Sequence, residues 1–400
     1  MITAKEVQSI VEAVYPKVVE FRRDLHMHPE LSGEEVRTSA RIQEELTKLN
    51  IPFGTNWQRA VFGTLEGSGP APAGKYTGVG IRADFDALPI LEANDVPYAS
   101  QTPGVMHACG HDVHTAVLLG SAMVLDQLKD RFGGAVKFFF QPSEEKDGGA
   151  KHMIDAGCME NPAVNAVLGL HIHAGLRSGD LQFCPGPMNA ATCTLYIDVE
   201  GFGCHGAHPD AGVDTILVAS HIVTALQAIT ARNLAPTTPG IVTIGSFHAG
   251  TKSNIIPGTA RLEGTLRAMT TDVMDQLKAL VTRTAENVAA AFGAKAKVTL
   301  EDGCPCLVND PALTGVFMDY AREMFGADRV CQMPVPSLGG DDFAYFTQYC
   351  DGVYFGLGVT TGNEGHEQML HNEYLFPDEE AMKTGIMMEV MTALKLLGAA

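Results

Sequence analysis

The order of apolar and polar positions predicts two kinds of domain along the chain. In the first part, segments that are apolar at helical spacing alternate with short apolar runs typical of buried strands. The expected helices are residues 4–26, 34–49, 112–129 and 149–156, and the expected strands are residues 79–83, 136–140 and 166–170. This alternation is typical of an α/β domain built on a largely parallel sheet.

The order of elements changes after a Pro/Gly-rich segment at residues 184–187. The next expected elements are strand 193–200, helix 214–231, strand 240–248, strand 259–267, helix 271–292 and strand 295–301. This order is βαββαβ, the ferredoxin-like arrangement. The α/β pattern then resumes with helix 311–325, an apolar run at 353–358 and helix 378–397. We therefore expect a discontinuous α/β domain, residues 1–187 and 303–400, with an α+β domain, residues 188–302, inserted into it.

Composition excludes several classes of partner. The chain has 28 Lys and Arg against 47 Asp and Glu, a net charge of −19, which is the opposite of a nucleic-acid-binding surface. No continuous apolar run approaches the roughly 18 residues of a membrane span, and the N-terminal region lacks the apolar centre of a signal peptide. The nine cysteines are irregularly spaced and form no CxxC pair. We therefore expect a cytoplasmic protein with reduced thiols and with neither a nucleic-acid nor a membrane partner.

Cysteine and histidine residues gather in the segment MHACGHDVH, residues 106–114, directly before an expected helix. Cys109 and His111 are two residues apart, so on an extended backbone both side chains share a face and could bind one transition metal. A buried reduced cysteine beside loop histidines is the alternative interpretation, because a single metal needs about four ligands. This segment alone does not decide between the two.

Further polar residues follow the expected strands. Glu144 and Glu145 come shortly after strand 136–140, and Asp84 and His171 follow two other strands directly. Open α/β sheets bind ligands at the carboxyl ends of their strands, and adjacent carboxylates there are costly unless a cation receives them. Adjacent residues point apart on an extended backbone, so one carboxylate could bind metal while the other faces a substrate. The glutamate pair alone could be an acidic helix start, but the whole set favours a metal site.

Seven motifs, in order over nearly the whole chain, resemble the M20 family of metallo-amidohydrolases and metallopeptidases. They are RRDLHMHPELSGEE (22–35), IRADFDALPI (81–90), MHACGHDVHTA (106–116), QPSEEKDGGA (141–150), GLHIH (169–173), CHGAHP (204–209) and HNEYLF (371–376). The resemblance is greatest to the branch of N-acyl-amino-acid amidohydrolases, hippurate hydrolases and auxin-conjugate hydrolases. It implies a zinc-peptidase-like α/β catalytic domain with an inserted ferredoxin-like lid, through which a homodimer would form.

The resemblance also implies roles for residues at the matching positions. The ligands of two divalent metals would be Cys109, His111, Glu145, His171 and His371. Glu144 would be the general base and acid for a water molecule that attacks an amide carbonyl polarised by metal. Asp84 would support a ligand imidazole or the catalytic water, with Asp86 as the competing choice. A strand-end aspartate that caps the next turn is the structural alternative.

Three residues of the expected lid also match the family pattern. His205 resembles a histidine that reaches the active site, often that of the neighbouring subunit, and stabilises the tetrahedral oxyanion. Asn254 and Arg267 resemble residues that hold the substrate's carboxylate, which an arginine fork matches bidentately. A turn former and a solvated strand-end base are the alternative interpretations.

The chain departs from the usual branch pattern at two places. Residues 339–343 read GGDDF, with Gly340, Asp341 and Asp342, where related chains tend to have GSEDF. Cys204 stands before the lid histidine, where a small residue is usual, and an inert packed thiol is favoured there over a reactive one.

The expected function is metal-dependent hydrolysis of N-acyl-L-amino acids, which releases a carboxylic acid and a free amino acid. A dipeptidase or carboxypeptidase is the main alternative, because dipeptides also present an amide next to a carboxylate. A thiolate ligand favours zinc, while carboxylate and imidazole also admit manganese, cobalt or nickel.

Two remoter classes remain. Residues 201–206 match GxGxxG, but no helix opens on the third glycine and no acid ends the next strand, which argues against an NAD-dependent oxidoreductase. A non-catalytic metal-dependent binding protein would have no need of the spare carboxylate beside Glu145.

Overall fold

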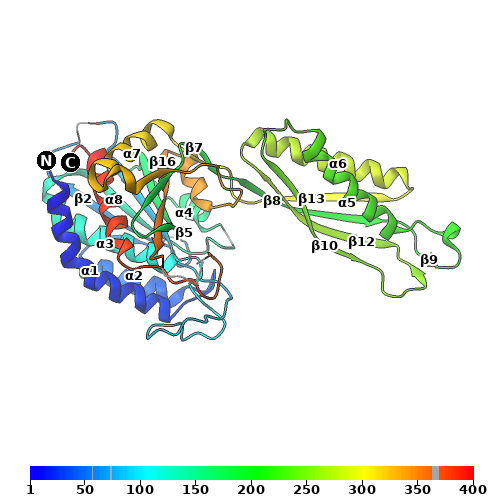
Figure 1. Ribbon diagram of the computed structural model, residues 1–400, viewed down its shortest axis with the longest axis horizontal. Coiled ribbons are helices and arrows are strands. Elements are labelled where there is room, and N and C mark those ends of the chain that lie inside the picture. The colour runs from blue at the N-terminus through cyan, green and yellow to red at the C-terminus, as the bar shows by residue number, and fades with distance from the viewer. Residues whose placement is uncertain (56, 73, 147, 363–368) are drawn as a thin grey trace. The chain divides into compact units, whose positions relative to one another are not determined.

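In the computed structural model, which describes residues 1–55, 57–72, 74–146, 148–362 and 369–400, the chain forms two compact units (Figure 1). The first contains residues 1–186, 308–335 and 342–400, and the second contains residues 187–307 and 336–341. The sequence pattern placed the inserted segment at 188–302. The short segment 336–341, which follows a stretch of the first unit, groups with the second unit, and the pattern of apolar positions gave no indication of this.

The first unit is built on an eight-stranded mixed sheet in the order β1-β2-β4-β3-β5-β16-β6-β15. Its four central strands are parallel neighbours: β4 (Gly133–Gln141), β3 (Gly78–Asp84), β5 (Ala166–Arg177) and β16 (Asp351–Thr360). Four shorter or antiparallel strands flank them: β1 (Phe53–Gly54), β2 (Val61–Ser68), β6 (Leu181–Phe183) and β15 (Val330–Gln332). The predicted α/β class and parallel centre are confirmed.

Strand β5 is longer than its apolar run predicts. The strand was expected to end at residue 170, but pairing with β16 continues it to Arg177, so His171 lies inside a strand instead of after one. In the neighbouring strand β3, Arg82 pairs with Gly169 and the strand ends two residues later at Asp84. His171, two residues after Gly169, therefore still lies level with the end of β3. The polar residues therefore gather at one edge of the parallel centre, as parallel strands require.

Helices cover this sheet and anchor the segment that carries the candidate ligands. They are α1 (Ala4–Met27), α2 (Val36–Lys48), α3 (His111–Leu128), α4 (Gly149–Asp155), α7 (Pro311–Phe325) and α8 (Ala381–Leu396). Helix α3 packs against α1, α8 and the sheet, which explains why it is apolar on nearly all sides. Gly120 leaves room for this packing, because a Cβ there would lie 2.5 Å from Ile386 Cδ1 and 3.0 Å from Val18 Cγ2. The start of α3 is thus rigidly placed.

One carboxyl group is buried inside this helical layer. Glu389 of α8 is fully buried, its Oε2 lies 2.6 Å from Ser121 Oγ of α3, and its Oε1 has no hydrogen-bond partner among the described residues. Burial raises the pKa of Glu389 to about 8 from an ordinary value of 4.5. Between these values the folded protein keeps the proton that the unfolded chain loses, so this group makes stability fall as pH rises from about 4.5 to about 8.

We expect Glu389→Gln to stabilise the protein at pH 8 by about 2–4 kcal/mol and to have little effect at pH 4.5. The amide keeps the volume and the acceptor for Ser121 but has no proton to lose. Thermal unfolding of both proteins between pH 4.5 and 9 tests this prediction. A stability difference that does not change with pH would contradict it.

The second unit is a four-stranded antiparallel sheet in the order β10-β12-β8-β13, with two helices (Figure 1). Its elements are β8 (Ala191–Glu200), α5 (Thr215–Arg232), β10 (Gly240–Ala249), β12 (Thr259–Ala268), α6 (Thr271–Ala291) and β13 (Lys295–Asp302). This is the predicted βαββαβ order. Helix α5 is long and apolar enough to cross a membrane by length and composition alone, but Val218, Ile222, Leu226 and Ile229 are buried in the core of this unit.

Four short strands complete the two units. The strands β9 (Cys204–His205) and β11 (Ile255–Ile256) pair with each other in the second unit. The strands β7 (Gly186–Asn189) and β14 (Leu307–Asn309) lie where the chain passes from one unit to the other. None of these short strands was predicted, because two to four residues are too few to show an alternating pattern.

Candidate active site

Six candidate side chains of the first unit come together near the ends of the parallel strands. They are Cys109 before α3, His111 at its start, Glu144 and Glu145 after β4, His171 in β5 and His371 before α8. Their donor atoms form three overlapping groups, each within 4.8 Å: Cys109, His111 and His171; Cys109, Glu145 and His371; and His111, Glu144 and Glu145. The structure therefore brings together every ligand named from the sequence, together with the spare carboxylate.

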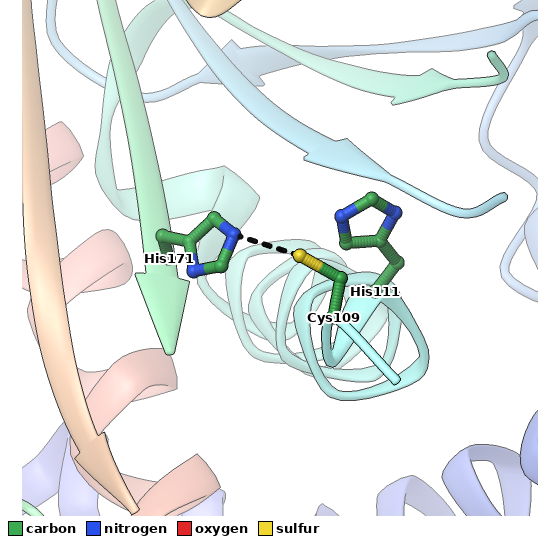
Figure 2. A group of neighbouring side chains, drawn as sticks. All are labelled: Cys109, His111 and His171. Atoms are coloured by element: carbon green, nitrogen blue, oxygen red, sulfur yellow. Dashed lines mark hydrogen bonds between the residues drawn. The ribbon is translucent and has the colours of Figure 1, made fainter. Parts of the chain in front are cut away.

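Cys109 lies between two imidazoles (Figure 2). Its Sγ is 3.5 Å from Nε2 of His171, and it also belongs to the group with Glu145 and His371. A thiolate can contact two metals at once, so membership of two groups is the arrangement that a shared ligand needs. A backbone hydrogen bond keeps His371 next to Cys109: the N–H of His371 donates to the carbonyl of Ala108 at 2.7 Å.

The hydrogen bonds of His111 and His171 leave one ring nitrogen of each for a ligand. Nδ1 of His171 lies 2.7 Å from the carbonyl of Ile172 and must donate, so the lone pair is on Nε2, the atom 3.5 Å from Cys109 Sγ. Nδ1 of His111 lies 3.0 Å from Asp86 Oδ1, while its Nε2 is buried with no hydrogen-bond partner among the described residues. A buried ring nitrogen without a partner is costly. The site's donors therefore fit a bound divalent cation.

The two strand-end aspartates have different partners. Asp86 accepts hydrogen bonds from His111 Nδ1, from Ser32 Oγ at 2.7 Å and from the N–H of Glu145 at 3.0 Å. Asp84 instead accepts from His114 Nδ1 at 2.6 Å, and its nearest oxygen is 3.7 Å from His111 Nε2. The acid that contacts Nδ1 of the candidate ligand His111 is therefore Asp86, the competing choice of the sequence analysis, and not Asp84.

We expect Asp86→Asn to weaken metal binding by about 10–100-fold, the usual effect of removing an acid behind a ligand histidine. The amide has only one acceptor oxygen, and its NH₂ group can donate to Nδ1 of His111. His111 would then carry its proton on Nε2, the nitrogen that is needed for metal. Competition with a fluorescent chelator gives the metal affinity directly. Unchanged affinity in the folded variant would show that Asp86 does not orient the ligand.

Electrostatics of the site favour cation binding. Burial alone would raise the pKa of Asp84, but the charge of Arg82, with the imidazoles of His111 and His114 beside it, holds it well below its ordinary value. Burial lowers the pKa of His114 to about 4, so this ring is neutral and its Nε2 accepts the N–H of Ile172 at 2.9 Å. Burial also raises the pKa of Cys109, so the thiol keeps its proton until a cation displaces it.

Sequence reasoning missed a buried ion network beneath the site. Arg82 of β3 is fully buried and donates to Asp84 at 2.7 Å, to Asp342 at 2.6 Å and to Gln141 at 2.7 Å. Asp342 begins η4 (Asp342–Gln348) and also accepts from the N–H of Ala150 in the first turn of α4. The signal was an arginine inside an otherwise apolar strand, which requires a buried partner. The GGDDF segment keeps the aspartate that this network uses.

The residues predicted in the inserted domain fall at two separate places in the second unit. His205 of β9 is exposed and pairs with Ile255, and the carbonyl of the adjacent Asn254 accepts from Gly206 at 2.9 Å. Arg267 lies near the far end of β12, about 26 Å along the strand from Thr259, and donates to the carbonyl of Leu338 at 2.8 Å. Asn254 and Arg267 therefore lie far apart within the second unit of one chain.

Thiolate, imidazole and carboxylate donors at the ends of parallel strands, with a further carboxylate beside them, define a metal-dependent hydrolase. The family model described as peptidase family M20/M25/M40 matches residues 80–395. The chain belongs to this family, which the seven sequence motifs also resemble. It is a metal-dependent enzyme that hydrolyses amide bonds.

Relatives named for different activities match most of the chain. Thermostable carboxypeptidase 2 of Saccharolobus solfataricus is 36% identical and covers 98% of each chain. N-acetyl-L-cysteine deacetylase of Bacillus subtilis is 38% identical over 88% of this chain and 82% of its own length. The crystal structure of a Bacillus subtilis protein described as a dinuclear metal binding peptidase from the M20 family has a TM-score of 0.83 and 31% identity, and covers 97% of this chain and 99% of its own.

Proposed function

We propose that the protein hydrolyses N-acyl-L-amino acids to a carboxylic acid and a free amino acid. The observation that carries this proposal is the set of three overlapping donor groups, two of which share Cys109 while the third contains the spare carboxylate Glu144. Relatives named as deacetylases of N-acetylated amino acids support the N-acyl substrate class. The relative named a carboxypeptidase favours peptides as the second candidate substrate.

Two divalent metals would be held by five ligands, one of which, the sulfur of Cys109, would be shared between them. His111 and His171 would bind metal beside Cys109, and Glu145 and His371 would complete the ligand set. When bound, such ions polarise the amide carbonyl and lower the pKa of a water molecule towards 7. Zinc suits the thiolate, and manganese, cobalt or nickel suits the remaining donors.

The chain's own groups would then move the proton and orient the ligands. Glu144 would take the proton of the attacking water and return it to the leaving amine nitrogen. Asp86 would hold His111 in the tautomer that leaves Nε2 for metal. Asp84, held ionised by Arg82, would add negative charge beside His111 and keep His114 in place.

The second unit would act as a lid and as a dimerisation domain. His205 is exposed on the β9 and β11 pair, so its imidazole is available to another chain, where it would donate to the oxyanion. Asn254 lies beside it, whereas Arg267 lies at the other end of β12, so the two would hold substrate from different chains of a homodimer. Light scattering that finds only monomers at assay concentration would contradict this arrangement.

Amine release from matched substrates tests the proposed function. The panel contains N-acetyl- and N-benzoyl-L-amino acids and dipeptides with the same C-terminal residue, assayed with chelated protein and with zinc or manganese restored. We expect metal-restored cleavage of the acyl compounds and at least tenfold lower kcat/KM on the dipeptides. Preference for the dipeptides would favour the carboxypeptidase or dipeptidase alternative.

A further inference from the structure

The motif at residues 22–35 touches the site without supplying a ligand to it. Its last residue, Glu35, is fully buried at the N-cap position of α2, yet its side chain makes no capping hydrogen bond. The first N–H groups of α2 are instead taken by Glu30, whose two oxygens accept from Arg37 at 2.9 Å and from Thr38 at 2.8 Å. The side chain of Glu35 therefore does not cap α2, although side chains at the N-cap position usually do so.

The carboxylate of Glu35 reaches the turn that carries the general base. Its Oε1 accepts from the backbone N–H of Ser143 at 2.8 Å and from Ser143 Oγ at 3.1 Å. The carbonyl of Ser143 accepts from the N–H of Gly149 at 3.2 Å. Every polar group of Ser143 is therefore bonded, and the residue is fully buried.

Ser143 has an unusual backbone conformation directly before Glu144. Its φ is 58°, in the left-handed region that residues other than glycine rarely adopt. Such a conformation persists only where the surroundings hold it, and here Glu35 holds it through two hydrogen bonds. Relaxation of Ser143 to a negative φ would turn the chain at Glu144 and move its carboxylate away from the attacking water.

We infer that Glu35 is a positioning residue for Glu144: through Ser143 it fixes the direction in which the general base points. This inference rests on the proposed function, because it assigns Glu35 a part only in a reaction that Glu144 performs. The two hydrogen bonds of Glu35 go to Ser143, the residue before Glu144, so its effect passes through the backbone of Ser143.

Substitutions at Glu35 and Ser143 test the inference. Glu35→Leu removes the acceptor, and we expect kcat to fall about 100-fold, the cost of a misplaced catalytic group, with KM changed less than threefold and metal content unchanged. Glu35→Gln keeps an acceptor and should restore kcat to within about fivefold of wild type. Glu34→Gln, on the exposed neighbouring residue, is the matched control.

A rescue experiment separates positioning from general stability. Glycine adopts positive φ without support, so Ser143→Gly added to Glu35→Leu should raise kcat at least fivefold over the single variant. Valine resists positive φ, so Ser143→Val in the wild-type background should lower kcat. This variant tests the inference if Glu35→Leu does not fold. In a Glu144→Gln background, Glu35→Leu should lower the residual rate no further.

Three results would overturn the inference: wild-type kcat in folded Glu35→Leu, loss of bound metal in that variant, or no rescue by Ser143→Gly. Failure of the proposed function is distinguishable, because it would appear as no hydrolysis of acylated amino acids by the wild-type protein. Metal content by mass spectrometry and thermal unfolding are recorded for each variant, so the test does not depend on activity alone.

Discussion

We expect Glu144→Gln to lower kcat for amide hydrolysis by about 10³-fold, within the range that a general base supplies, while metal content stays at the wild-type level. The amide cannot accept the proton of the attacking water or return a proton to the leaving nitrogen. Glu144 is the carboxylate grouped with His111 and Glu145 but outside both groups that contain the thiolate, so its loss should leave the ligands in place. Steady-state kinetics and metal analysis of the same preparation measure both quantities.

The control for this variant is Glu160→Gln, which changes an exposed glutamate elsewhere in the first unit. Full activity in Glu144→Gln would remove the general base from the mechanism. Loss of metal would instead mean that Glu144 is a ligand, and the distinction between Glu144 and Glu145 would be wrong.

A second large effect is expected at the shared sulfur. Cys109→Ser should reduce bound metal from two ions to at most one per chain and lower kcat/KM at least 10³-fold. Serine keeps the size of the side chain, but its hydroxyl does not ionise to bind as a thiolate does. Both donor groups that contain Cys109 lose a ligand at once, so both ions should be affected.

The matched control is Cys331→Ser, because this cysteine is exposed and lies in β15 at the edge of the sheet. Metal analysis after dialysis, with activity measured on the same sample, tests the prediction. Two tightly bound ions in folded Cys109→Ser would contradict a bridging role for the sulfur.

The parts of the fold that the sequence predicted are those where burial imposes a simple pattern. Strands β3 and β4 are buried on both faces and appear as apolar runs, and α3 is apolar nearly all round because α1, α8 and the sheet enclose it. Strand β2 was missed because its buried positions include Gly63. An alternation that contains glycine is weak.

Glu145 and His171 could be predicted because residue type and position after an apolar run agree. Cys109 and His111 could be predicted because of their spacing, whereas His371 followed only from the family resemblance. The choice between Asp84 and Asp86 could not be predicted, because residues two apart on an extended backbone point to the same side. Only the placement of α3 decides it, since that helix sets His114 against Asp84 and His111 against Asp86. Residue spacing along one strand does not contain this information.

Other contacts at the site depend on segments that are distant in sequence. Arg82 meets Asp342, 260 residues away, and Glu35 meets Ser143, 108 residues away. The separation of Asn254 from Arg267 likewise follows from the length of β12 and not from either motif. Local patterns give the elements and the reactive residue types, whereas the partners of buried charges require the three-dimensional structure.

The most direct test of the central claim is a titration of chelated protein with zinc or manganese, with bound metal and hydrolysis of an N-acyl-L-amino acid measured on the same samples. The site predicts no activity without metal, and activity that rises with occupancy until two ions are bound per chain. Full activity in protein shown to contain no metal would contradict the account.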